Sequence, residues 1–185
     1  ITHELRGAWA ESERELREGL EIGERIGDRE GIVTILVHLT NVYRGMRSVE
    51  NVRVFAKRTG EAAADAHMAP YVSNACANLA WVAWREGDSA EAKRLGLEAM
   101  DHMGAAPIPR WYGLWPLIAV ATSANDVEAA IAHCRALLVP FERPRPAELD
   151  AALQDAIAAF DEGDRGRALS RLRDSVSLAG DAAFL

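Results

Sequence analysis

The stretch "NLAWVAWREGDSAEAKRLGLEAM", residues 78–100, decides the fold because it contains a complete helix–turn–helix pattern. Apolar and small residues recur at helical spacing until Gly87 and Asp88 interrupt them. Glycine readily ends a helix, and aspartate readily caps the start of the next. Glu91 follows Asp88 by three residues and completes a capping box. The stretch therefore predicts two antiparallel helices joined by a tight turn.

Turns of the same kind recur along the chain at nearly constant intervals. The equivalent positions are Gly7, Arg47, Gly87, Asn125 and Gly163, at spacings of 40, 40, 38 and 38 residues. A fixed period of about 20 to 50 residues is typical of a repeat array. Helical periodicity dominates between the turns, and no alternating strand pattern is visible. The sequence predicts an all-α array of helical hairpins with about nine helices; an irregular helical bundle is the alternative.

Breakers and helix-start signals divide the chain into units. Glycine- and proline-containing stretches at 27–31, 67–70, 104–109 and 140–146 separate the helical segments. Asn125 with Glu128 predicts a second capping box. We expect a single domain, 1–185, made of units at about 1–28 (partial), 29–67, 68–104, 107–140 and 145–180.

The repeating unit resembles the tetratricopeptide repeat. In residues 78–100 the match lies in the Leu79-Ala80 pair, the small or aromatic site at Ala83, the Gly87-Asp88 turn, and the small residues Ala92 and Ala99. Equivalent residues elsewhere are Leu39, Tyr43 and Ala168. The period exceeds the about 34 residues of the standard repeat. The resemblance implies a right-handed superhelix, and units of this longer kind resemble those beside the ATPase modules of bacterial LuxR-type regulators and in cyclase-coupled signalling proteins.

The same resemblance places one stripe of each unit's first helix on a concave face. The candidate binding residues are Asn41, Arg44, Asn74, Trp81, Trp84, Arg85, Tyr112 and Trp115. The same offset adds Thr34 and Val37 in the earlier unit, and Asp150, Leu153, Ile157 and Phe160 in the last. Aromatic anchors flanked by a few polar groups are typical of a recognition groove. The alternative is that the tryptophans fill volume beside alanine-rich stripes and belong to the core.

Composition and missing motifs exclude several functional classes. A net charge of −7 argues against nucleic acid as a partner. There is no phosphate-binding loop, and the histidines lack metal-ligand spacing, so we expect no cofactor and no metal. His38 is interpreted as a core or groove histidine. Residues 68–84, which lie within the longest stretch without a formal charge, are too short and too polar to cross a membrane.

We expect a noncatalytic scaffold that binds a protein or peptide segment, including neighbouring domains of its own chain. The alternative is a sensor that binds a small-molecule effector in the aromatic groove, and an enzyme is the least favoured class. A homodimer is compatible with each. Cys76 and Cys134 lie far apart and indicate reduced thiols and a cytoplasmic location. The chain starts at Ile1 and ends in "DAAFL", so we expect a piece of a longer bacterial signalling or transcription-regulating protein.

Overall fold

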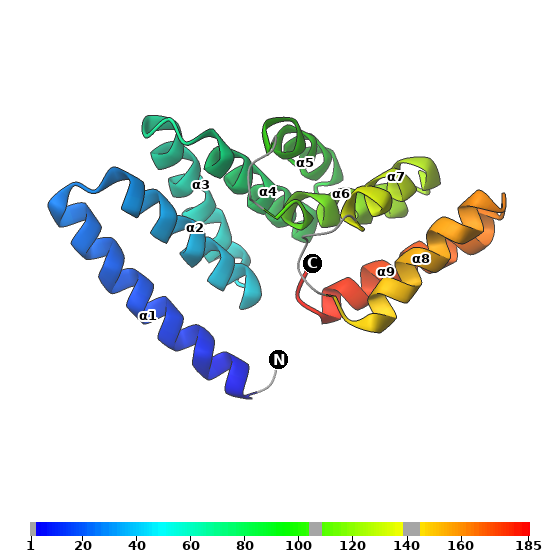
Figure 1. The fold of residues 1–185 in the computed structure, drawn as a ribbon, viewed down its shortest axis with the longest axis horizontal. Helices are drawn as coiled ribbons and strands as arrows, with labels where there is room; N and C mark the ends of the chain where they lie inside the picture. Colours follow the sequence, from blue (N-terminus) through cyan, green and yellow to red (C-terminus); the bar gives the residue numbers. More distant parts are fainter. Residues whose placement is uncertain (1–2, 104–108, 139–144) are drawn as a thin grey trace.

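The computed structural model describes residues 3–103, 109–138 and 145–185. In these residues the chain is all-α, and its nine helices pack in sequence as a curved array of hairpins (Figure 1). The helices are α1 (His3–Ile26), α2 (Arg29–Gly45), α3 (Val49–Asp65), α4 (Ala69–Arg85), α5 (Ser89–Met103), α6 (Trp111–Ser123), α7 (Val127–Leu137), α8 (Ala147–Asp161) and α9 (Arg165–Asp181). None of these helices is both long and apolar enough to cross a membrane.

The turns within the hairpins share one backbone conformation. Arg47, Gly87, Asn125 and Gly163 have positive φ angles of 58°, 83°, 57° and 83°. A residue in this left-handed region is a common way to end a helix. The turn predicted at each of these residues is confirmed. The turn predicted at Gly7 is wrong, because α1 continues through it; one glycine costs a helix only about 1 kcal/mol.

An aspartate directly after the left-handed residue starts the next helix at Gly87, Asn125 and Gly163, whereas Ser48 follows Arg47 and makes no side-chain cap. Asp88 Oδ1 accepts a hydrogen bond from the Glu91 backbone N–H at 3.0 Å, so the N-cap at Asp88 is confirmed. The reciprocal bond of the capping box is not formed, because the Asp88 N–H donates to the Ala83 carbonyl and both Glu91 carboxylate oxygens accept from Arg94. Asp126 caps α7 by accepting from the Ala129 N–H at 3.2 Å. The cap predicted at Asn125 is therefore wrong by one residue. Asparagine tolerates the left-handed conformation, so Asn125-Asp126 takes the same two roles as Gly87-Asp88.

The order of packing changes at the end of the array. Helix α2 packs on α4, and α4 packs on α6, but α9 rather than α8 packs on α6. The expectation that α8 continues the concave face is wrong, and its residue Leu153 is fully buried. Because α9 lies beside α6, the residues that follow α9 reach the inner side of the array, where Figure 1 shows the C-terminus.

Small residues allow the helices of the central hairpin to approach closely. Ala80, Ala92 and Ala99 are each 0% exposed. A Cβ added at Gly96 would lie 2.8 Å from Leu117 Cγ, so α5 and α6 are also in close contact. These buried positions agree with the register of the hairpin expected from the sequence.

Replacing Ala92 by leucine is expected to lower the free energy of unfolding by about 1–3 kcal/mol, because the added methylenes overpack a closed contact. Urea denaturation measures this loss. The matched control is Ala90→Leu, the same change at an exposed position of α5. Equal midpoints for the two variants would contradict the assigned packing.

Candidate functional site

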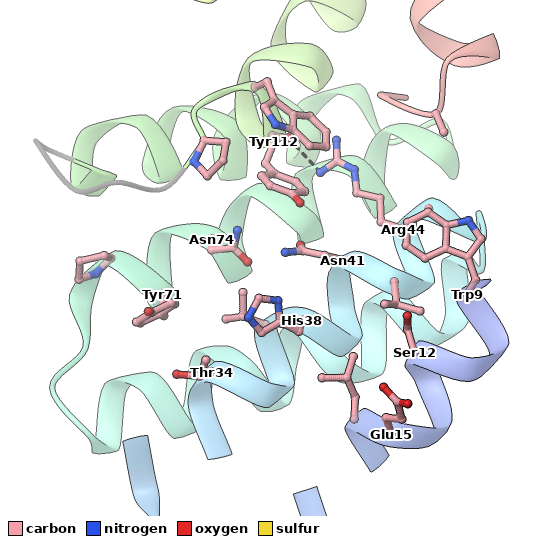
Figure 2. A pocket seen from close by; sticks show the side chains of 18 residues that line it. Trp9, Ser12, Glu15, Thr34, His38, Asn41, Arg44, Tyr71, Asn74 and Tyr112 are labelled. Carbon is pink, nitrogen blue, oxygen red and sulfur yellow. Dashed lines mark hydrogen bonds between the residues drawn. The ribbon is translucent and has the colours of Figure 1, made fainter. Parts of the chain in front are cut away.

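A cavity of about 880 Å³ lies between α1, α2, α4 and α6 (Figure 2). This volume lies within the range of about 300–1,000 Å³ typical of small-molecule sites. Helix α2 supplies one stripe, and α1, α4 and α6 supply the walls. The lining residues are Trp9, Ser12, Glu15 and Leu16 of α1; Thr34, Val37, His38, Asn41, Val42, Arg44 and Gly45 of α2; Pro70, Tyr71 and Asn74 of α4; Pro109, Trp111, Tyr112 and Ala183.

A glycine brings α1 and α2 together at one edge of the cavity. A Cβ on Gly45 would lie only 2.8 Å from Cζ2 of Trp9. The missing side chain therefore makes room for the Trp9 indole at the end of α2. Elsewhere in the same interface, the Tyr43 hydroxyl donates to Glu13 at 2.7 Å, and Arg17 donates to that hydroxyl at 2.6 Å. These contacts fix the wall formed by α1.

Arg44 is a buried cation at the end of the cavity next to Tyr112 of α6, which we call the head of the cavity. Its side chain is 2% exposed. Nη1 donates to Asn78 Oδ1 at 3.2 Å and to the Tyr112 carbonyl at 3.1 Å, and Nη2 donates to the Phe184 carbonyl at 2.9 Å. All three acceptors are neutral, and within the described residues no carboxylate forms an ion pair with Arg44.

Aromatic rings surround the Arg44 guanidinium. Its central carbon lies 5.5 Å from the ring centroid of Trp81, 5.2 Å from Trp111 and 5.1 Å from Tyr112. Rings at this range attract a cation through their negative faces. Burial nevertheless lowers the pKa of Arg44 to about 9, because the charged form loses its hydration. The side chain is still protonated at neutral pH, so the head of the cavity carries positive charge.

Two asparagines place further polar groups in the cavity. Figure 2 shows the Asn41 and Asn74 side chains pointing toward one another from α2 and α4. The Asn74 Oδ1 accepts from Asn78 Nδ2 at 3.1 Å. The Asn41 Oδ1 is buried and has no hydrogen-bond partner in the described structure. The Asn41 amide therefore keeps one buried acceptor that the described residues leave unpaired.

The structure separates the predicted site residues into two groups. Asn41, Arg44, Asn74 and Tyr112 line the cavity, as do Thr34 and Val37. Trp81 and Trp115 do not, because they are 1% and 0% exposed within the core. Their expected exposure on a groove is wrong. The indoles fill the space left beside alanine-rich helices, which is the alternative interpretation given above.

The remaining two predicted residues lie away from the cavity. Trp84 is half-buried and packs against the edge of the core, while Arg85 is exposed. The Arg85 guanidinium carbon lies 5.7 Å from the Trp81 ring centroid and 5.9 Å from that of Trp84. This stacking shields indole surface from water and needs no ligand to explain it.

Several residues of the cavity were missing from the sequence prediction. Trp9, Tyr71 and Trp111 all line it. A lone tryptophan in the charge-rich stretch that became α1 was the available signal for Trp9. Trp111 is only 5% exposed, yet it forms part of the wall.

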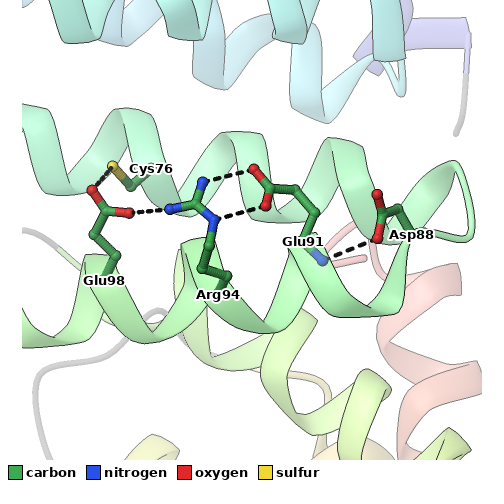
Figure 3. Close-up of polar contacts among 5 residues, drawn as sticks. All are labelled: Cys76, Asp88, Glu91, Arg94 and Glu98. Carbon is green, nitrogen blue, oxygen red and sulfur yellow. Dashed lines mark hydrogen bonds and ion pairs between the residues drawn. The ribbon is translucent and has the colours of Figure 1, made fainter.

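A second polar cluster lies on the outer face of the α4–α5 hairpin (Figure 3). Both carboxylate oxygens of Glu91 accept from Arg94 at 2.7 Å, and Arg94 donates to Glu98 at 2.8 Å. Cys76 Sγ on α4 donates to Glu98 Oε1 at 3.8 Å. Most of the polar atoms in this cluster are paired with one another, and Arg94 is largely exposed. The cluster therefore serves the hairpin, and we assign it no ligand.

The Cys76 thiol is expected to react slowly with iodoacetamide at neutral pH, because only the thiolate attacks. Burial, followed by the Glu98 charge, raises the pKa of Cys76 to about 11. Its alkylation rate should therefore keep rising with pH up to about 11, and Glu98→Gln should shift that rise to lower pH. Residue-resolved mass spectrometry measures both rates. Cys134, whose pKa burial raises to about 12, is the slower internal comparison. A Cys76 rate that levels off near pH 8.5, as for a free thiol, would contradict this environment.

Comparisons of this chain with known proteins identify no family and no relative. No protein-family model matches the sequence, and neither a curated protein nor a solved structure matches it. Within the described ranges, no three His, Cys, Asp or Glu side chains gather as metal ligands. The site is therefore interpreted from its own residues.

Proposed function

We propose that the chain is a noncatalytic, tetratricopeptide-like binding module of a bacterial signalling or transcription-regulating protein, and that it acts in the cytoplasm. The observation that carries the proposal is the cavity itself, which combines aromatic walls with convergent polar groups at Asn41, Asn74 and Arg44. Sites of this composition are the usual place for a ligand.

A small-molecule effector is the occupant that the cavity favours. The cavity volume of about 880 Å³ suits a drug-sized ligand. Four helices and residue Ala183 border the cavity. The hairpins around the cavity supply the surface for a protein partner or a neighbouring domain of the same chain. Binding of the effector would then bias that second contact, which is the ordinary basis of regulation by a ligand.

A catalytic role has less support from the same residues. Ser12, Glu15 and His38 border the cavity, and these residue types occur in nucleophilic sites. A nucleophile needs a base within hydrogen-bond reach, and the base needs a residue that orients it. Among the described side chains, no hydrogen bond joins any two of these three. The proposal therefore assigns them to binding.

The experiment that tests the proposal is a ligand-detected NMR screen of a fluorinated fragment library against three proteins. Asn41→Trp places an indole in the cavity, and Leu97→Trp places one on α5, where Leu97 is 42% exposed and is not one of the lining residues. Fragments that bind the parent should lose affinity at least about tenfold in the Asn41 variant and keep it in the Leu97 variant. Circular dichroism checks that both variants are folded. An absence of hits, or hits unaffected by Asn41→Trp, would contradict the proposal.

A further inference from the structure

The guanidinium of Arg44 has one edge that the protein leaves incompletely paired. Nε is buried and has no hydrogen-bond partner, and Nη2 on the same edge donates to the Phe184 carbonyl in the described structure. A carboxylate accepts two parallel hydrogen bonds from such an edge. A buried charge without a counter-charge is costly, so an anion at this position would relieve that cost.

The residues after α9 occupy the space next to the Nε–Nη2 edge of Arg44. Phe184 and Leu185 are 2% and 1% exposed. The Phe184 ring meets Trp111 edge-on at 5.1 Å and lies 5.9 Å from Trp115. Ala183, in the left-handed conformation with φ of 60°, lines the cavity directly before Phe184. The chain therefore presents a neutral carbonyl where the cation favours a negative oxygen.

The charges that border the cavity select the kind of anion. Arg44 is the only lysine or arginine among the lining residues given above, and Glu15 also lies on the lining. One buried cation suits a monoanion better than a phosphate dianion. The walls next to Arg44 are aromatic, since Trp9, Trp111 and Tyr112 line the cavity. Rings of this kind favour a planar or apolar ligand body.

We propose that the cavity binds a small aromatic carboxylic acid, whose carboxylate takes the Nε–Nη2 edge of Arg44 in place of the Phe184 carbonyl. The inference rests on the proposed function of the cavity. It also assigns a consequence to binding, because an acid in this position releases the contact between α2 and residues 182–185.

Arg47 provides a matched control. It follows α2 by two residues, and its Nη2 donates to the carbonyls of Gly180 and Asp181, so it holds the same end of the chain. It does not line the cavity. Loss of Arg47 should loosen the C-terminal segment and leave recognition of an acid intact. Loss of Arg44 should loosen the same segment and also abolish recognition of the acid.

The experiment compares 2-naphthoate, 2-naphthamide and 2-naphthyl phosphate by isothermal titration calorimetry with the full chain, Arg44→Gln and Arg47→Gln. We expect the parent and Arg47→Gln to bind naphthoate roughly ten- to a hundredfold more tightly than the amide, as a charged hydrogen bond implies. Arg44→Gln should bind the two about equally. Phosphate binding tighter than naphthoate, or an acid preference that survives Arg44→Gln, would overturn the inference.

A spectroscopic measurement avoids dependence on the folding of the Arg44 variant. In the parent protein labelled with ¹⁵N, naphthoate should shift the Arg44 Nε–H signal, and naphthamide should shift it much less. An unmoved Nε–H signal at saturation overturns the inference. If naphthoate and naphthamide bind the cavity equally, or fragments of other chemistry bind there while naphthoate does not, the carboxylate assignment fails and the proposed function stands. If nothing binds the cavity, both fail.

Discussion

Replacing Trp115 by alanine is expected to lower the free energy of unfolding by about 3–5 kcal/mol. This side chain of α6 is 0% exposed and packs in the hydrophobic core, where it also contacts the ring of Phe184. Removal of a buried indole leaves a cavity that the surrounding helices fill only in part. Urea denaturation, followed by circular dichroism, measures the loss.

Trp84→Ala is the matched control for this loss. The same chemical change at a half-buried position should cost less than about 2 kcal/mol, since less apolar surface returns to water. Equal losses of unfolding free energy in the two variants, or no loss for Trp115→Ala, would contradict the assignment of Trp115 to the core. Such a result would support the predicted position of Trp115 on a groove.

Replacing Phe184 by alanine is expected to cost about 3 kcal/mol of unfolding free energy. The ring is 2% exposed against Trp111 and Trp115, and its backbone carbonyl accepts from Arg44. The variant should also show faster backbone hydrogen exchange at residues 182–185 than the parent does, because the segment loses its anchor. An unchanged denaturation midpoint together with an unchanged exchange rate would contradict the docked position of this segment.

The sequence was informative where the chemistry is local. A glycine or asparagine followed by aspartate fixes both the end of one helix and the start of the next, so the turns at Gly87, Asn125 and Gly163 could be predicted. Arg47 has the same conformation without being glycine or asparagine, and only the regular spacing pointed to it. Alanine at helical spacing likewise predicted the close contacts made by Ala92.

The sequence was less informative about which face of a helix meets solvent. The stripe through Asn41 and Arg44 on α2 faces the cavity, but the corresponding positions Trp81 and Trp115 on α4 and α6 face neighbouring helices. The difference depends on how closely the next helix approaches, and that distance is set by side chains far away in the sequence. A tryptophan beside alanine-rich packing suits either position.

The contacts that close the head of the cavity could not be predicted from local patterns. Arg44 and Phe184 are hydrogen-bonded across 140 residues. This contact requires α9 to pack on α6, whereas the repeat pattern favours α8 in that place. Trp9 was missed for a related reason, because α1 was expected to be a partial unit and turned out to be one long helix that forms a wall.

The tryptophan indole N–H signals provide the most direct test that the cavity, and not the tryptophan cluster, is the binding site. The chain has five tryptophans, of which Trp9 and Trp111 line the cavity, Trp81 and Trp115 lie in the core, and Trp84 lies at its edge. In a ¹H–¹⁵N correlation spectrum titrated with 2-naphthoate, the signals of Trp9 and Trp111 should shift in a saturable manner while that of Trp84 stays in place. Saturable shifts centred on Trp84, with Trp9 and Trp111 unmoved, would contradict the account.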